Sequence, residues 1–113
     1  MKVYELITMV DSIKGNKIPE DTKLRQINEV EARVFCEIEK NNPKDYREKV
    51  SLTDELSVPM PYSRMYLLYL CAMIAFSSGE FETYKELVFE YENVFCEYAK
   101  FFIRNRKAAQ IFS

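Results

Sequence analysis

The feature that most constrains this chain is an uncharged stretch of twelve residues, Met65 to Phe76, in which almost every side chain is apolar. A segment that crosses a bilayer needs about 20 apolar residues, whereas runs of about 10 to 14 are more typical of a helix buried in a protein core. The stretch therefore predicts the central helix of a folded domain, with the other segments packed around it.

Length and composition limit what this domain can be. The chain has 113 residues, enough for one hydrophobic core, and its 48% hydrophobic and 30% charged residues are typical of a globular protein. It contains eight Tyr and eight Phe, and tyrosine suits half-buried positions in cores and subunit interfaces. We expect a single helical domain over residues 1–105 and a flexible C-terminal tail over residues 106–113.

Apolar periodicity predicts two helices in the first part of the chain. The first follows the apolar residues from Val3 to Ile13, and Gly15 and Asn16 are expected to end it in the left-handed conformation of a C-cap. The second runs from about Asp21 to Lys40. Its inward stripe is Leu24, Ile27, Val30, Val34, Phe35 and Ile38, and its solvent side is Lys23, Arg25, Glu29, Arg33, Glu37 and Lys40. Glu29 and Arg33 are spaced for an ion pair on that solvent side.

The segment from Asn41 to Pro61 breaks this pattern. Pro59 and Pro61 prevent a regular helix, and connections longer than about 12 to 15 residues are uncommon in compact domains and often functional. This long, proline-containing connection is expected to be extended or to hold a short hairpin, and it is the first candidate for a partner contact.

Two further helices are expected after the connection. The central helix begins at Tyr62 and ends at Gly79, and the last helix begins at Glu80. That last helix has a broad apolar face formed by Phe81, Tyr84, Leu87, Val88, Tyr91, Val94, Phe95, Tyr98, Phe101 and Phe102. The short turn between the two helices predicts an antiparallel hairpin. The fold class is therefore all-α, a four-helix bundle-like domain with a long connection between helices 2 and 3.

The sequence offers little for catalysis. It has no histidine, which excludes Ser-His-Asp and Cys-His chemistry, and only two glycines, which excludes a glycine-rich phosphate loop. The three cysteines form no closely spaced pair, so we expect them to be reduced core residues, without a disulfide or zinc site. Glu82, Glu86 and Glu90 share one side of the last helix, where a solvated face is favoured over a cation site.

The charge of the chain and the residues near its two ends indicate which partners and which cellular location to expect. A net charge of -2 gives no basic face for nucleic acid, and the N-terminal residues lack the apolar region of a signal peptide, which favours a cytoplasm. Lys100, Arg104, Arg106 and Lys107 gather at the end of the last helix. They either complement the helix macrodipole or belong to a tail that orders on a partner through Ile111 and Phe112.

Several blocks of the sequence resemble small phage and prophage proteins of the head-tail connector, or adaptor, type, over about Met1 to Arg104. The blocks are Thr22-Lys23-Leu24, Ile27 to Arg33, Leu56-x-Val58-Pro59-x-Pro61-Tyr62, Tyr66-x-x-Tyr69-Leu70, and Gly79-Glu80 leading to Tyr84. The resemblance implies a non-enzymatic helical subunit that forms a ring on the portal protein at the virion head-tail junction. The resemblance also implies that such a ring is assembled in the bacterial host cytoplasm, docks tail-completion proteins, and surrounds a channel through which DNA passes without sequence-specific binding.

No cofactor, metal or catalytic residue is expected. The candidate interface residues are Tyr46, Leu52, Leu56, Val58, Tyr62, Arg104, Arg106, Lys107, Ile111 and Phe112. For the tyrosines of the central helix, core packing is the competing expectation, since an aromatic ring serves both roles. Two other functions stay open: a small helical regulatory or adaptor module that binds one protein partner through the last helix, and a carboxylate-based metal enzyme.

Overall fold

The computed structural model describes the backbone of residues 1–112 and the side chains of residues 1–107. The helices are α1 (Val3–Ile13), α2 (Glu20–Arg33), α3 (Arg64–Ser77) and α4 (Phe81–Phe112), with a π-helical turn η1 (Val34–Ile38) after α2 and a 3-10 turn η2 (Pro43–Asp45). Residues 1–112 form no β-strand, and a single isolated bridge joins Lys2 to Glu55. The predicted all-α fold is confirmed.

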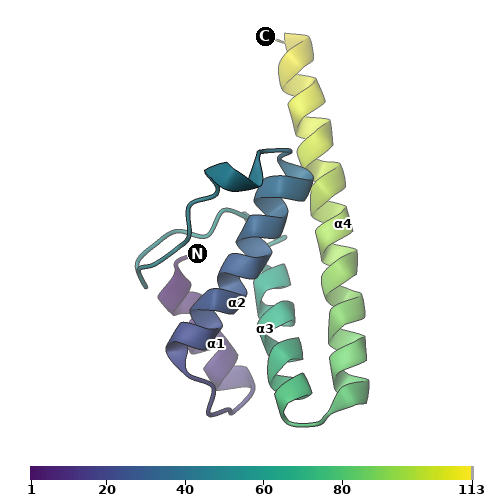
Figure 1. Cartoon of the computed structure of the whole chain (residues 1–113). Coiled ribbons are helices and arrows are strands. Elements are labelled where there is room, and N and C mark those ends of the chain that lie inside the picture. The colour runs from purple at the N-terminus through teal and green to yellow at the C-terminus, as the bar shows by residue number, and fades with distance from the viewer. Residues whose placement is uncertain (113) are drawn as a thin grey trace.

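Helix α3 lies at the centre of the arrangement. Helices α1 and α2 pack on one side of it, and α4 packs along the other side as the second arm of an antiparallel hairpin (Figure 1). Because α1 is short and α4 extends well past the other helices, the predicted bundle-like arrangement describes the molecule only loosely. The C-terminal part of α4 projects from the body without a neighbouring helix.

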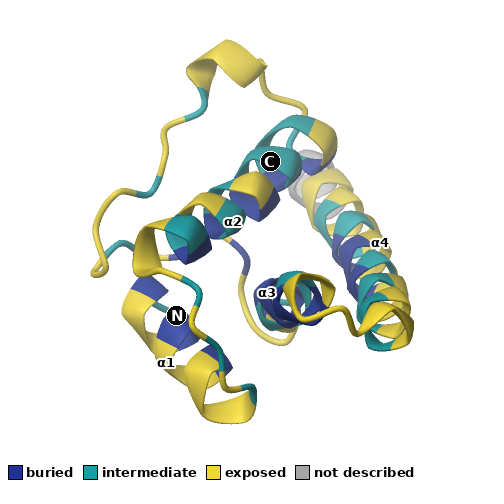
Figure 2. Cartoon of the chain, turned by 60° about the horizontal axis from the view of Figure 1, so that its bottom comes forward, coloured by how far each residue is buried: buried dark blue, intermediate teal, exposed yellow. Residues whose placement is uncertain are grey.

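The core forms around α3 because that helix is apolar on more than one side. Met65, Tyr66, Leu70, Ala72 and Ala75 are all fully buried. Burial of a large apolar side chain contributes about 1.5–3 kcal/mol, so this helix supplies much of the stabilisation of the fold. Figure 2 shows the buried residues of the other helices facing it.

The turn between α3 and α4 is tight because of one glycine. Gly79 adopts a φ of +78°, a left-handed conformation that costs little only for residues without a Cβ atom. The Glu80 amide then donates to the carbonyl of Ala75, which closes the turn. The predicted helical hairpin is present.

The end of α1 differs from the prediction. Gly15 does not adopt a positive φ, and the cap residue is Lys14 in an extended conformation. The Asn16 side chain closes the loop instead, because its amide donates to the Lys14 carbonyl at 2.9 Å and its oxygen accepts from the Ile18 amide at 3.1 Å. A side-chain turn therefore replaces the expected left-handed cap.

The second helix ends earlier as an α-helix than its periodicity predicts. It is α-helical to Arg33 and continues as the π-helical turn η1 to Ile38, where one extra residue per turn shifts the register of the side chains. Lys40 then adopts a φ of 61° and reverses the chain into the connection. Lys40 is therefore a turn residue, not the last residue of the helix.

Two residues that were expected on the solvent side of α2 are not there. Lys23 is only 5% exposed and its ammonium donates to Asp11 Oδ1 at 2.6 Å, which joins α2 to α1. Arg33 does not pair with Glu29, because its guanidinium turns toward Glu92 on α4. The charged groups thus hold helices together, a role that helical periodicity alone does not reveal.

The cysteines and the C-terminus also require corrections. Cys71 is buried, but Cys96 is exposed on α4, so the prediction that all three are core residues is wrong for Cys96. Helix α4 continues without a break from residue 105 to Phe112, where a flexible tail was predicted for residues 106–113. The side chains of Ile111 and Phe112 and the whole of Ser113 lie outside the described residues.

Candidate partner-binding surfaces

The connection between η1 and α3 is attached to the N-terminus of the chain. The amides of Val3 and Tyr4 donate to the carbonyls of Asp54 and Leu52 at 3.0 and 2.9 Å, and the Leu56 amide donates to the carbonyl of Met1 at 2.9 Å. These bonds satisfy the first amides of α1, which have no partner within the helix itself. The connection therefore follows a defined path over the surface.

A side chain on α2 fixes the middle of the connection. Asn28 Oδ1 accepts from the Tyr46 hydroxyl at 2.6 Å and from the Lys49 amide at 2.7 Å. Its Nδ2 group donates to the carbonyls of Lys49 and Leu24, at 2.9 and 3.0 Å. One amide side chain thus mimics a backbone pairing partner and holds the connection against α2.

The end of the connection is held by a buried carboxylate. Glu31 on α2 is 2% exposed, and its Oε2 atom accepts from both the amide and the hydroxyl of Ser57, at 3.1 and 2.7 Å. Its Oε1 atom accepts from the hydroxyl of Tyr66, which in turn accepts from the Val58 amide at 2.9 Å. Lys49 Nζ lies 3.8 Å from Oε2 and offsets part of the buried charge.

The Tyr66 phenol stays protonated at this site. Burial raises its pKa above the ordinary value, and the neighbouring negative charge of Glu31 raises it further. A protonated phenol donates to the carboxylate and still accepts from the backbone, so it links α2, α3 and the connection in one network.

These contacts divide the predicted interface residues into two groups. Leu56 and Val58 are 7% and 1% exposed and form part of the core, so the prediction that they contact a partner is wrong. Tyr46 and Tyr62 are half-buried, and the ring of Tyr62 lies 5.4 Å from Tyr98 and 5.0 Å from Phe101. For Tyr62 the competing expectation of core packing describes its position.

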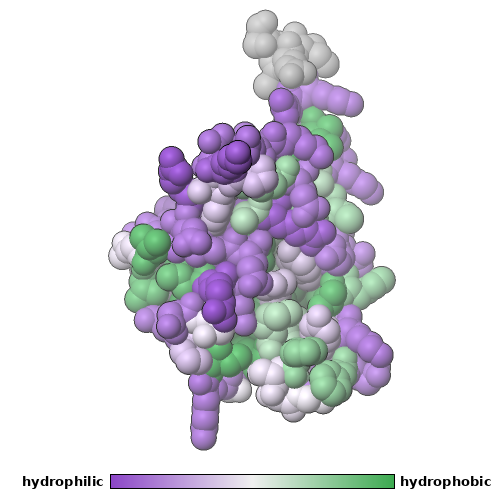
Figure 3. Space-filling model, viewed as in Figure 1, coloured by the Kyte–Doolittle hydropathy of each residue, from purple (hydrophilic) through white to green (hydrophobic). Residues whose placement is uncertain are grey.

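The exposed apolar residues beside the connection form what we call the connection surface, defined by Met9, Val50, Leu52 and Met60. Val50 is 76% exposed and Met60 80% exposed. An apolar pocket of about 300 Å³ opens between Met9, Met60 and Leu67. Figure 3 shows a hydrophobic area at the left edge of the molecule, where the connection runs. Exposed apolar groups gathered around a pocket, as Met9 and Met60 are, mark interaction sites more often than scattered ones do.

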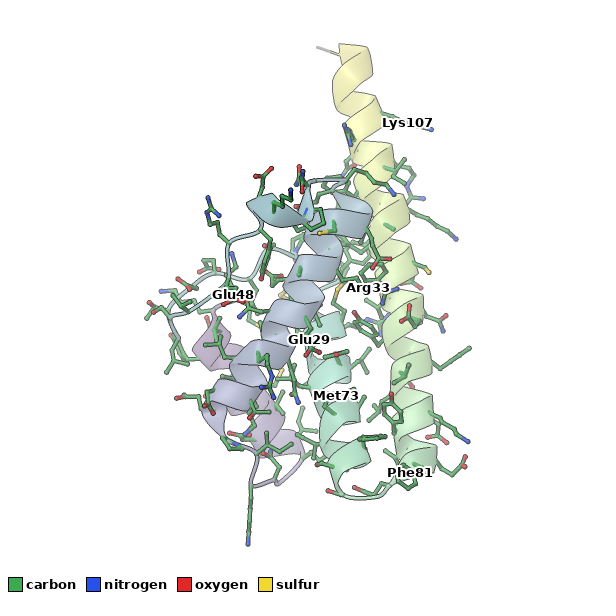
Figure 4. All side chains as sticks on the ribbon, in the orientation of Figure 1. Glu29, Arg33, Glu48, Met73, Phe81 and Lys107 are labelled. Atoms are coloured by element: carbon green, nitrogen blue, oxygen red, sulfur yellow. The ribbon has the colours of Figure 1, made fainter. Side chains whose placement is uncertain are left out.

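A second apolar area, the turn surface, is defined by Phe76 and Phe81 at the two sides of the α3–α4 turn. Each is 54% exposed, and their ring centroids are 5.7 Å apart in an edge-to-face arrangement. Figure 4 places Phe81 at the start of α4, at the end of the molecule away from the connection. Paired exposed aromatic rings are typical of the centre of a protein interface.

A cleft of about 270 Å³ lies between α2, α3 and α4, and the charged residues that line it are paired with other side chains. Arg33 donates to both oxygens of Glu92 at 2.8 and 3.0 Å and to Glu37 at 2.9 Å, and its guanidinium lies 3.8 Å above the Phe95 ring. On the opposite wall the Tyr69 hydroxyl donates to Glu29. Burial and that carboxylate raise the Tyr69 pKa, so the phenol is protonated. The side chains that line the cleft therefore connect α2, α3 and α4 to one another.

The basic residues at the end of α4 are separate from these areas. Arg104, Arg106 and Lys107 are exposed, and they follow the last rings that pack on the body, Phe101 and Phe102. Lys107 points away from the molecule in Figure 4. The basic residues that were predicted to contact a partner therefore lie on the projecting part of α4.

The buried roles of Lys23 and Glu31 were not predicted from the sequence, although the sequence contains a pattern that indicates them. Lys23 and Glu31 lie in the same row as Ile27, Val30 and Val34, three or four residues apart. A charged residue within an apolar row predicts a buried ionic contact, since its neighbours along the row face the core. Asn28 gave no such signal, because its partners come from a segment without periodicity.

Comparisons with known proteins do not assign this chain to a family. Comparison of the chain with protein-family models, curated proteins and solved structures finds no match. Within the part of the chain that the structure describes, no three His, Cys, Asp or Glu side chains gather closely enough to hold a metal ion. In the same part, every helix is too short or too polar to pass through a bilayer.

Proposed function

We propose that this chain is a non-enzymatic structural subunit that assembles with copies of itself into a ring, in the manner of a phage head-tail connector. The observation that carries the proposal is the presence of two different exposed apolar areas on one small domain. The connection surface includes Val50 and Met60, and the turn surface consists of Phe76 and Phe81. The α3–α4 turn lies at one end of the body, and the connection runs along its side (Figure 1).

Two unlike surfaces are what head-to-tail assembly requires. A contact between the same patch on both subunits closes as a dimer, whereas a contact between different patches leaves one of each free and continues until the ring closes. Docking of the paired Phe rings against the apolar pocket at Met60 would bury aromatic surface in a concave site, the usual chemistry of an interface anchor.

The resemblance to connector proteins supplies the partners in this proposal. The ring would form on a portal protein, receive tail-completion proteins, and leave an open channel for DNA at the head-tail junction of a virion assembled in a bacterial cytoplasm. The exposed basic residues Arg104, Arg106 and Lys107 on the projecting part of α4 are well placed for one of these protein contacts. The net charge of -2 agrees with a channel that does not retain DNA.

The experiment is co-sedimentation of the purified chain with portal rings from the genome that encodes it. The proposal predicts that several copies sediment with each portal ring. Phe81→Glu and Met60→Glu each place a charge in one apolar area and are expected to abolish multi-copy binding, whereas Arg25→Glu, at an exposed position of α2, is a control that retains it. A folded wild-type chain that stays in the supernatant contradicts the proposal.

A second candidate is a small regulatory module that binds one protein through α4, and one observation favours it. Phe89 and Ile103 on α4 are exposed, at 68% and 46%, on the side away from the body. A regulator of this kind forms a complex of fixed, small stoichiometry. The mass of the complex therefore separates the two functions.

A further inference from the structure

The side of α4 turned away from the core carries a row of exposed apolar residues, which we call the outer row. Phe89, Cys96 and Ile103 follow one another at intervals of seven residues, so they lie in one line along the helix. The buried residues Tyr91 and Val94 point to the opposite side. Figure 2 shows this division, with α4 buried toward the other helices and exposed on its outer side.

Polar residues, all but one of them charged, border the outer row along one side, and the sign of their charge changes along the helix. Steps of three and four residues keep them on one face of the helix. In order, this border consists of Glu82, Glu86, Glu90, Asn93, Glu97, Lys100, Arg104 and Lys107, all of them exposed. The border is therefore acidic from Glu82 to Glu97 and basic from Lys100 to Lys107.

We propose that a second copy of the chain covers this face, with the two α4 helices antiparallel and a two-fold axis beside Cys96. The outer row is symmetric about Cys96, since Phe89 and Ile103 are each seven residues away from it. In an antiparallel pair Phe89 of each chain packs against Ile103 of the other, and the two Cys96 side chains meet at the centre. The apolar row then forms a continuous contact over about 21 Å of helix.

Charge complementarity selects a second copy in this orientation. Reversing one helix against another brings the acidic half of each border beside the basic half of the other, so that Glu86 lies near Arg104 and Lys107 of the second chain. A parallel two-fold pair would instead place the two borders on opposite flanks of the contact, so their acidic and basic residues could not face each other. On the other side of the row Glu92 is already bound by Arg33, so it adds little to the contact.

The pairing also fits the shape of the molecule. Helix α4 lies at the edge of the body and extends past it, so its outer side is open along its length (Figure 1). The ring contact proposed above uses Met60 and Phe81, and neither belongs to the outer row or its charged border. The two proposals therefore use different residues and can fail separately.

Cysteine cross-linking tests the axis and the direction together. Diamide takes two electrons and two protons from a pair of thiols, which leaves a disulfide. We expect it to link two chains through Cys96, and we expect Cys96→Ser, which retains Cys36 and Cys71, to prevent the link. In the Cys96→Ser background, Lys85→Cys places a thiol about 33 Å from its counterpart in the antiparallel pair and beside it in a parallel pair. We therefore expect no disulfide dimer from that variant.

Charge exchange tests the border residues without relying on the thiol. Glu86→Arg is expected to weaken dimerisation by about tenfold in sedimentation velocity at low salt, and Arg104→Glu added to the same chain is expected to restore it. Asp21→Arg, at an exposed position of α2, is the control for a general change of charge and should leave the dimer unchanged. Circular dichroism checks that each variant is folded.

Other results would overturn either the pairing or the ring proposal. A folded wild-type chain that sediments as a monomer at high concentration contradicts it, and so does a Lys85→Cys variant that cross-links while Cys96 does not. Loss of portal binding with retained dimers would count against the ring proposal alone. Loss of dimers with retained multi-copy portal binding would count against the α4 pairing alone.

Discussion

The hydroxyl of Tyr66 on α3 donates a hydrogen bond to the buried carboxylate of Glu31 on α2 and accepts one from the Val58 amide. This one phenol connects the central helix, its neighbour and the end of the long connection. Because the hydroxyl and both of its partners are removed from water, loss of the hydroxyl leaves polar groups unsatisfied. The connection surface, which includes Met60, depends on this anchor.

Removing that hydroxyl should destabilise the domain more than its size suggests. Tyr66→Phe is expected to lower the free energy of unfolding by about 1–3 kcal/mol, because the Val58 amide and Glu31 each lose a buried partner. Urea denaturation measures the change. Tyr4→Phe, at a tyrosine that is 46% exposed, should have almost no effect.

The same phenol predicts how stability depends on pH at the alkaline end. The pKa of Tyr66 in the folded state is raised above 10.0, so the folded protein holds a proton that the unfolded chain releases. This stabilisation is fully present below about pH 10 and is lost as the pH rises further. The difference in stability between wild type and Tyr66→Phe should therefore shrink in alkaline solution. A difference that grows there would contradict the assignment.

The contact between Asp11 and Lys23 predicts the behaviour in acid. The hydrogen bond from Lys23 lowers the Asp11 pKa below 3.8, with a second contribution from Asn16. A lowered folded-state pKa stabilises the protein above the ordinary pKa and loses effect as the pH falls through the lowered value. Asp11→Asn should thus be less stable than wild type at neutral pH, and the two should converge below about pH 3. Thermal melts over an acid series measure this.

Arg33 should be sensitive even to a conservative change. Its guanidinium makes a bidentate contact with Glu92 and lies over the Phe95 ring, geometry that a lysine ammonium cannot reproduce. Arg33→Lys is expected to cost about 1–2 kcal/mol in unfolding free energy. The matched change Arg25→Lys, at an exposed position on the same helix, should be neutral.

Asn28 should control the order of the connection. Asn28→Ala removes the acceptor of the Lys49 amide and of the Tyr46 hydroxyl, so we expect faster hydrogen exchange at Lys49 with little change in α3. Asn93→Ala, on the exposed side of α4, is the control. Rapid exchange of the whole connection in the wild-type chain would mean that these anchors do not hold it in solution.

Periodicity predicted the helices well because their positions follow from burial of apolar rows. The stretch from Met65 to Phe76 is helical and central, and the hairpin through Gly79 forms as its short turn indicates. The end of α2 was less predictable, since the apolar row continues to Ile38 while the backbone changes from α-helix to π-helix after Arg33. The same limit applies at Asn16, where a side chain replaces the expected glycine cap.

The candidate surfaces were only partly predictable for a related reason. Leu52 and Leu56 look alike within the connection, yet Leu52 is 37% exposed and Leu56 is 7% exposed. Their orientation is set by backbone bonds to Tyr4 and Met1, which lie 48 and 55 residues away in sequence. Long-range pairing of this kind leaves no local pattern, whereas the seven-residue spacing of Phe89, Cys96 and Ile103 can be read directly.

The most direct test of the central claim is a mixing experiment on portal rings, with mass measured by native mass spectrometry or mass photometry. All chains carry Ile103→Glu, which removes α4 pairing. Met60→Glu and Phe81→Glu each eliminate one of two unlike surfaces, so neither variant should form rings alone. In a mixture, the intact turn surface of the Met60→Glu chain can contact the intact connection surface of the Phe81→Glu chain. No further contact is possible, so assembly should stop at two copies. Rings formed by either variant alone, or by the mixture, would contradict a subunit with two different binding surfaces.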